Sequence, residues 1–62
     1  MNRIDTSRFF RSHMTAPKGR GGWMFEDKAG NIILTHCGTY AEAKKAAQQQ
    51  AKKMDTYLYV CP

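Results

Sequence analysis

The chain has only two cysteines, Cys37 and Cys61, and no run of aliphatic residues longer than Ile32–Leu34. A membrane-spanning helix needs about 20 apolar residues, and a secretory signal needs a basic start followed by about 7 or more apolar residues. We therefore expect no membrane span and no signal peptide, and we expect the protein to be cytoplasmic. In a reducing cytoplasm both thiols should be free, with a disulfide as the alternative.

The spacings that build metal sites are also missing. The residues with soft metal-ligating atoms are His13, His36, Cys37 and Cys61, and no Cys-x-x-Cys or His-x-x-x-His pattern joins them. His36 and Cys37 are adjacent, so on a strand their side chains would point to opposite faces and could not pair as nucleophile and base. Isolated carboxylates offer no acid–base pair, so we expect no metal, no cofactor and no enzymatic activity.

Acidic residues are scarce: five Asp and Glu stand against ten Lys and Arg, which gives a net charge of +5 in 62 residues. An acid-free stretch carries Arg8, Arg11, Lys18 and Arg20, and a second basic group contains Lys44, Lys45, Lys52 and Lys53. Such a charge attracts polyanions, either nucleic acid or an acidic protein surface.

The length of 62 residues predicts a single small domain. We divide it into a basic N-terminal segment with a glycine-rich loop, residues 1–21, and a β-β-α-β core, residues 22–62. A hydrophobic content of 42% is sufficient for a globular core.

The clearest expected element is a helix that begins at Tyr40. Thr39 and Glu42 have the spacing of a reciprocal capping box. Apolar residues then recur every three or four positions, which predicts one stripe facing the core: Tyr40, Ala43, Ala47, Ala51 and Met54. The lysines and glutamines of the other side should face water.

Three strands are expected around this helix, at residues 22–26, 31–37 and 56–61, because these stretches are rich in β-branched and aromatic residues. The first two should form a hairpin closed by residues 27–30, with Gly30 in the left-handed conformation. If Glu26 lies opposite Asn31, Trp23 and Phe25 share the core face with Ile32 and Leu34. A three-residue loop with a bulge would shift this register.

The expected fold is therefore α+β: a small antiparallel three-stranded sheet of order 2-1-3, with one long helix across one face. Residues 6–14 form either a short helix capped by Asp5 or Thr6, or a further strand, because so short a stretch does not settle its periodicity. In both cases the side chains of Phe9 and Phe10 should pack against the rest of the domain.

The stretch Pro17–Gly22, "PKGRGG", is interpreted as a flexible or tightly turned entry to the first strand of the hairpin, with phosphate binding by its backbone N–H groups as the alternative. Trp23 and Phe25 should be core residues. Tyr57 and Tyr59 alternate with Leu58 and Val60, so they are candidates for stacking on bases.

The segments "GGWMFED", "CGTY" and "EAKKAA" resemble the sheet-plus-helix DNA-binding domain of plant ethylene-response factors and the arm-binding domain of phage integrases, across residues 8–54. The resemblance implies that residues 8–14 are the first strand and that Arg8, Arg11, Arg20 and Trp23 contact DNA. Strand 56–61 has no counterpart in that family. The whole chain also resembles small proteins of bacteria and their phages.

These observations predict a non-enzymatic basic binding protein, with nucleic acid as the partner. The alternative is a phage-type inhibitor or adaptor that binds an acidic surface of a host protein. The candidate nucleic-acid contacts are Arg8, Arg11, Lys18, Arg20, Lys44, Lys45, Tyr57 and Tyr59.

Overall fold

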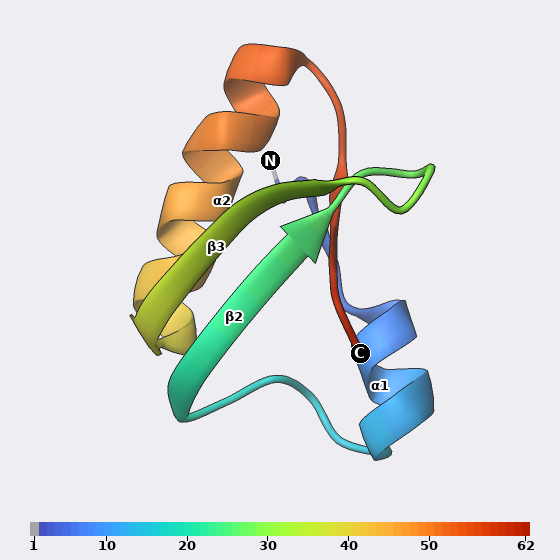
Figure 1. Cartoon of the computed structure of the whole chain (residues 1–62), viewed down its shortest axis with the longest axis vertical. Coiled ribbons are helices and arrows are strands. Elements are labelled where there is room, and N and C mark those ends of the chain that lie inside the picture. The colour runs from blue at the N-terminus through green and yellow to red at the C-terminus, as the bar shows by residue number, and fades with distance from the viewer. Residues whose placement is uncertain (1) are drawn as a thin grey trace.

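The computed structural model describes residues 2–62 and contains two helices and a four-stranded mixed sheet (Figure 1). In chain order the elements are β1 (Ile4–Asp5), α1 (Ser7–His13), β2 (Arg20–Glu26), β3 (Ile32–Thr39), α2 (Tyr40–Met54) and β4 (Leu58–Val60). The strand order across the sheet is β1-β4-β2-β3.

The expected α+β class is confirmed, whereas the expected sheet was one strand too small. β2 pairs antiparallel with both β3 and β4, which is the predicted 2-1-3 arrangement. β1 then adds to the outer side of β4 in parallel, with Ile4 opposite Leu58. A strand of two residues is too short to show an alternating pattern, which is why the sequence did not reveal it.

Helix α2 begins where the sequence predicted. The Thr39 side chain accepts a hydrogen bond from the Glu42 backbone N–H at 3.2 Å, and the Glu42 carboxylate accepts one from the Thr39 N–H at 3.1 Å. Ala43, Ala47 and Ala51 are fully buried against the sheet. Met54 was expected in the same stripe but is exposed, because it is the last residue of the helix.

The β2–β3 hairpin has a different register from the one that we favoured. Its turn forms as expected, with the Gly30 N–H donating to the Asp27 carbonyl and Gly30 at φ +92°. Glu26 lies opposite Ile32 rather than Asn31, and an irregularity between Phe25 and Glu26 shifts the register by one more residue, so that Phe25 lies opposite Leu34. Leu34 packs against the core as predicted, whereas Ile32 is 53% exposed.

The core lies between α2 and one face of the sheet. Trp23 and Phe25 are buried there, as predicted, together with Ile4, Leu58 and Val60. Because neighbouring side chains on a strand alternate between faces, Met24, Thr35 and Tyr59 lie on the opposite face of the sheet.

The N-terminal segment resolves as the helix α1. The Asp5 carboxylate accepts a hydrogen bond from the Ser7 N–H at 2.8 Å, so Asp5 caps the helix, and Thr6 makes no side-chain cap. The strand that the family resemblance implied for residues 8–14 is therefore wrong. The glycine-rich entry also differs from expectation, because β2 begins at Arg20, two residues before the predicted start at Gly22.

Candidate nucleic-acid interface

Three of the five carboxylates act within their own turns or caps. Asp5 caps α1, Asp27 accepts hydrogen bonds from the N–H groups of Ala29 and Asn31 at 2.9 Å each, and Glu42 closes the capping box of α2. These hydrogen bonds stabilise the ionised form and so hold the pKa of each carboxyl below its ordinary value. These three acids remain charged and committed to backbone donors.

The other two carboxylates form ion pairs. Arg3 lies 3.2 Å from Asp55, and Arg8 lies 3.4 Å from Glu26, measured between nitrogen and oxygen. Within residues 2–62 the other eight of the ten basic side chains form no ion pair. They are Arg11, Lys18, Arg20, Lys28, Lys44, Lys45, Lys52 and Lys53.

Arg20 is the first residue of β2 and lies beside the start of α2, and Lys18 lies just before this strand. The Gly19 carbonyl accepts a hydrogen bond from the Tyr40 N–H at 2.8 Å, and Arg20 lies opposite Thr39 in the hairpin. Both basic residues are exposed. The predicted phosphate candidates Lys44 and Lys45 follow one turn later in α2, so four candidates lie near the first two turns of this helix.

The glycines of this segment differ in what they require. Gly19 has φ +83°, a conformation that side chains disfavour. Gly21 and Gly22 have ordinary backbone angles, and a Cβ at either position would have no neighbouring atom within 4 Å. The fold therefore leaves open space over the first half of β2.

Two of the predicted contact residues, Arg8 and Tyr59, bind each other. The Arg8 guanidinium carbon lies 4.2 Å from the centroid of the Tyr59 ring, and Arg8 also donates to the Lys28 carbonyl at 3.3 Å. With the Glu26 ion pair, Arg8 ties α1 to β4 and to the hairpin. One face of the Tyr59 ring is covered by this contact.

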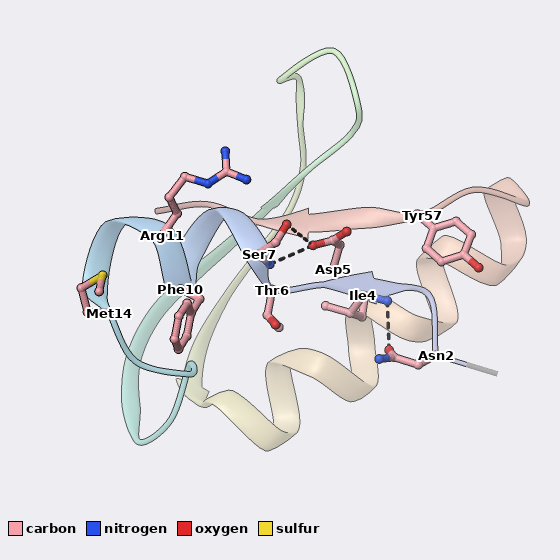
Figure 2. A pocket seen from close by; sticks show the side chains of 9 residues that line it. All are labelled: Asn2, Ile4, Asp5, Thr6, Ser7, Phe10, Arg11, Met14 and Tyr57. Carbon is pink, nitrogen blue, oxygen red and sulfur yellow. Dashed lines mark hydrogen bonds between the residues drawn. The ribbon is translucent and has the colours of Figure 1, made fainter.

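Tyr57 and Arg11 line a groove along the outer side of β1 (Figure 2). Tyr57 lies at one end, and Phe10 and Met14 of the α1 segment lie at the other. The exposed fractions are 49% for Tyr57, 52% for Phe10 and 76% for Met14. The expectation that both phenylalanines dock is right for Phe9, which packs on the core, and wrong for Phe10.

The groove itself was missed by the sequence reading. Adjacent Phe9 and Phe10 in a helix are about 100° apart, so only one of them can face the core, and this spacing was the available signal. Phe9 takes the inward position and lies 5.8 Å from Trp23 between ring centroids. Phe10 is thereby left at the surface beside Arg11.

The two cysteines are free thiols, Cys37 exposed and Cys61 half-buried. Burial, and then the neighbouring Glu26 carboxylate, raise the pKa of the Cys61 thiol. In the described part of the chain, no three His, Cys, Asp or Glu side chains gather closely enough to hold a metal ion. No helix among these residues has the length and apolarity needed to cross a membrane.

Three surface features are candidates for binding a partner: the exposed Lys18 and Arg20, the open space over the first half of β2, and the groove between Tyr57 and Phe10. Comparison of the chain with protein-family models, with curated proteins and with solved structures finds no match.

Proposed function

We propose that the protein is a non-catalytic nucleic-acid-binding protein that contacts phosphates through Arg11, Lys18, Arg20, Lys44 and Lys45. The observation that carries this proposal is the division of the charges. The acids are used in caps, turns and two ion pairs, while eight cations are left without an acidic partner among residues 2–62. Binding to phosphates gives these cations partners and releases counterions from the nucleic acid.

The open surface over β2 supports the same proposal. Gly21 and Gly22 leave room for a ligand backbone to approach the strand closely, and Arg20 precedes them directly. Exposed backbone and small residues beside a cation suit the approach of a sugar–phosphate chain. Trp23 is buried and takes no part in this surface.

Contact with phosphates alone would not distinguish one sequence from another. The exposed Tyr57 offers one aromatic ring for stacking, and Tyr59 is partly covered by Arg8. We therefore expect binding that depends strongly on salt and weakly on base sequence. Single strands, whose bases are free to stack, should bind at least as well as duplexes.

The experiment compares two variants of equal net charge by fluorescence anisotropy with labelled oligonucleotides. The first variant carries Arg11→Gln, Lys18→Gln and Arg20→Gln, and the control carries Lys28→Gln, Lys52→Gln and Lys53→Gln. Each substituted residue is a surface cation without an ion pair. The proposal predicts that the first variant loses about 10-fold or more in affinity beyond the loss in the control. Equal losses would show that only net charge matters and would contradict the assigned surface.

A second candidate function has its own supporting observation. The groove brings Phe10, Met14, Tyr57 and Arg11 together at the surface, and these residue types are enriched in protein–protein interfaces. If the protein is an adaptor or inhibitor, this groove would accept an apolar side chain of the partner protein, and an acidic residue of that partner would lie beside Arg11.

Capture from a nuclease-treated bacterial lysate separates the two candidates. A stoichiometric protein that stays bound after nuclease, and that is lost with Phe10→Ser and Met14→Ser, would favour the adaptor. Loss of all bound material on nuclease treatment would favour nucleic-acid binding. Because Phe10 and Met14 are exposed, these substitutions should leave the fold intact.

A further inference from the structure

The aromatic rings of the chain divide into those that the fold uses and those that it leaves free. Phe9 and Tyr40 pack against Trp23, with centroid separations of 5.8 Å and 5.1 Å. Phe25 is fully buried, and one face of the Tyr59 ring lies under a guanidinium group. Of the seven aromatic rings, all within the described residues, two are therefore left exposed and without such a contact.

These two rings, Phe10 and Tyr57, line the same groove. Phe10 belongs to α1, and Tyr57 directly precedes β4. They lie toward opposite ends of the groove, with the buried side chain of Ile4 between them (Figure 2). The groove has a volume of about 770 Å³, within the range of about 300 to 1,000 Å³ that is typical of small-molecule sites. Flat rings at both ends of a hollow suit planar ligands.

The backbone beside this groove is closed to an added peptide strand. The Arg3 carbonyl accepts a hydrogen bond from the Leu58 N–H, so the peptide groups of the next residue, Ile4, point away from β4. The outward N–H of Ile4 is taken by the Asn2 side-chain oxygen at 3.0 Å. A peptide that adds a strand to a sheet needs such a donor. An occupant of the groove therefore has to bind through the side chains that line it.

The charges along the groove direct a phosphate to one end. Arg11, at the α1 end, is exposed and forms no ion pair in the described part of the chain. Asp5 accepts hydrogen bonds from the Ser7 N–H at 2.8 Å and from the Ser7 hydroxyl at 2.5 Å, and its charge repels phosphate from the middle of the groove. From the α1 end the chain leads to Lys18 and Arg20 at the start of β2 (Figure 1). A phosphate backbone held by these cations would pass Arg11 with its bases turned into the groove.

We propose that this groove binds unpaired bases of single-stranded nucleic acid, one stacked on Phe10 and one on Tyr57, with a phosphate at Arg11. This inference rests on the proposed function and extends it from phosphate contact to base contact. Stacking uses the π-face that every base has, so it requires no particular sequence. The bases of a duplex are stacked on each other, so a duplex reaches the cations and leaves the groove empty.

Three labelled ligands separate base contact from phosphate contact in fluorescence anisotropy. They are a single DNA strand of about 12 nucleotides, a strand of the same length with abasic sites throughout, and the corresponding duplex. The Phe10→Ala and Tyr57→Ala double variant removes both free rings. The control is Ile32→Ala with Met54→Ala, which removes two apolar side chains that are 53% and 41% exposed and lie outside the groove.

The ring variant should lose affinity only where bases are free to stack. We expect a loss of about 10-fold or more for the single strand, because each stacked base contributes substantially to such complexes. For the abasic strand and the duplex the loss should stay within about 2-fold, since their phosphate contacts are unchanged. The control should stay within about 2-fold for all three ligands. All four substituted side chains are exposed, so the variants should keep the fold, which circular dichroism verifies.

A photo-cross-link locates the bases in the wild-type protein. Irradiation with a single strand that carries 5-iodouracil should join the base to Phe10 or Tyr57, as identified by mass spectrometry of the peptides. Cross-links confined to residues outside the groove would overturn the proposal.

The outcomes keep this inference apart from the proposed function. If all three ligands bind alike and the ring variant changes none of them, phosphate binding stands and the groove assignment is wrong. If no ligand binds at low salt, both are wrong. If the ring variant binds nucleic acid normally but loses a protein that the wild type captures from nuclease-treated lysate, the groove belongs to a protein partner and the proposal is overturned.

Discussion

The Arg8 guanidinium lies over the Tyr59 ring, with its central carbon 4.2 Å from the ring centroid, while one of its nitrogens pairs with Glu26. This single side chain joins α1, β2 and β4. The contact explains how a helix with no fully buried residue is held against the sheet, with Phe9 packing on the core as its second attachment. Arg8 is therefore primarily a structural residue.

Replacing Arg8 with alanine should lower the free energy of unfolding by about 1 to 2 kcal/mol, because the ring contact and a half-buried ion pair are both lost. Arg8→Lys should recover only part of this loss, since an ammonium group cannot stack flat on a ring. Chemical denaturation followed by circular dichroism measures both. Arg11→Ala, which removes an exposed cation, serves as the control and should change stability by less than about 0.5 kcal/mol. An Arg8→Ala protein as stable as the control would show that the contact contributes nothing.

Tyr40 offers a test of the core beneath α2. Its ring packs edge-on against Trp23 at 5.1 Å between centroids, and its hydroxyl is buried without a hydrogen-bond partner. Tyr40→Phe keeps the ring and removes an unpaired polar group, so stability should stay the same or rise by up to about 1 kcal/mol. Trp23→Ala should instead cost about 3 to 5 kcal/mol, since it empties a buried site. Thermal unfolding compares them, and a clear loss of stability in Tyr40→Phe would mean that the hydroxyl has a partner.

Gly22 separates the requirements of the fold from those of binding. A Cβ at this position meets no atom within 4 Å, and glycine is a weak strand former. Gly22→Thr should therefore increase stability by about 0.5 to 1 kcal/mol, and it should weaken nucleic-acid binding if the ligand approaches β2 closely. Anisotropy and denaturation on the same preparation measure both effects. Increased stability with unchanged affinity would exclude β2 from the contact surface.

Acid should destabilise the protein through its caps and turns. The pKa values of Asp5, Asp27 and Glu42 are held below their ordinary values, 3.8 for Asp and 4.5 for Glu, by hydrogen bonds from Ser7, Asn31 and Thr39. A lowered pKa in the folded state means stability that is complete above the ordinary pKa and lost as pH falls through the folded one. The free energy of unfolding should hence be nearly constant above about pH 5 and decline below about pH 4.

Glu42→Gln identifies one of the groups responsible for this decline. The amide oxygen can still accept from the Thr39 N–H but does not titrate in this range, so the decline between about pH 5 and pH 3 should become shallower. Urea titrations at several pH values provide the comparison. A decline identical to that of the wild type would show that Glu42 does not contribute to acid unfolding.

The sequence predicted those parts of the fold whose signals are local and repeated. The capping box at Thr39 and the alanine spacing located α2, and the residues after Glu26 located the turn. β1 could not be predicted in this way, because its two residues are a strand only through pairing with Leu58 and Tyr59, more than 50 positions away. The irregularity at Phe25 and Glu26 arises from the fit between two strands, so the exposure of Ile32 was also not predictable from alternation.

The candidate site was predicted in part as well. Net charge and the acid-free stretch indicated the basic residues, and their exposure agrees with the use proposed for Arg11, Lys18 and Arg20. The sequence could not show that Arg8 is engaged by Tyr59 and Glu26, because these three residues come from three separate elements. The groove between Tyr57 and Phe10 likewise forms only when β1 is in place.

The dependence of nucleic-acid affinity on salt tests the central claim most directly. Contact between the unpaired cations and about 4 to 6 phosphates predicts that log affinity falls against log salt concentration with a slope of about −4 to −5. The Arg11, Lys18 and Arg20 triple variant should reduce that slope by about 3, whereas the charge-matched control should leave it nearly unchanged. An affinity that does not vary with salt, or no binding to DNA or RNA at low salt, would contradict the proposed function.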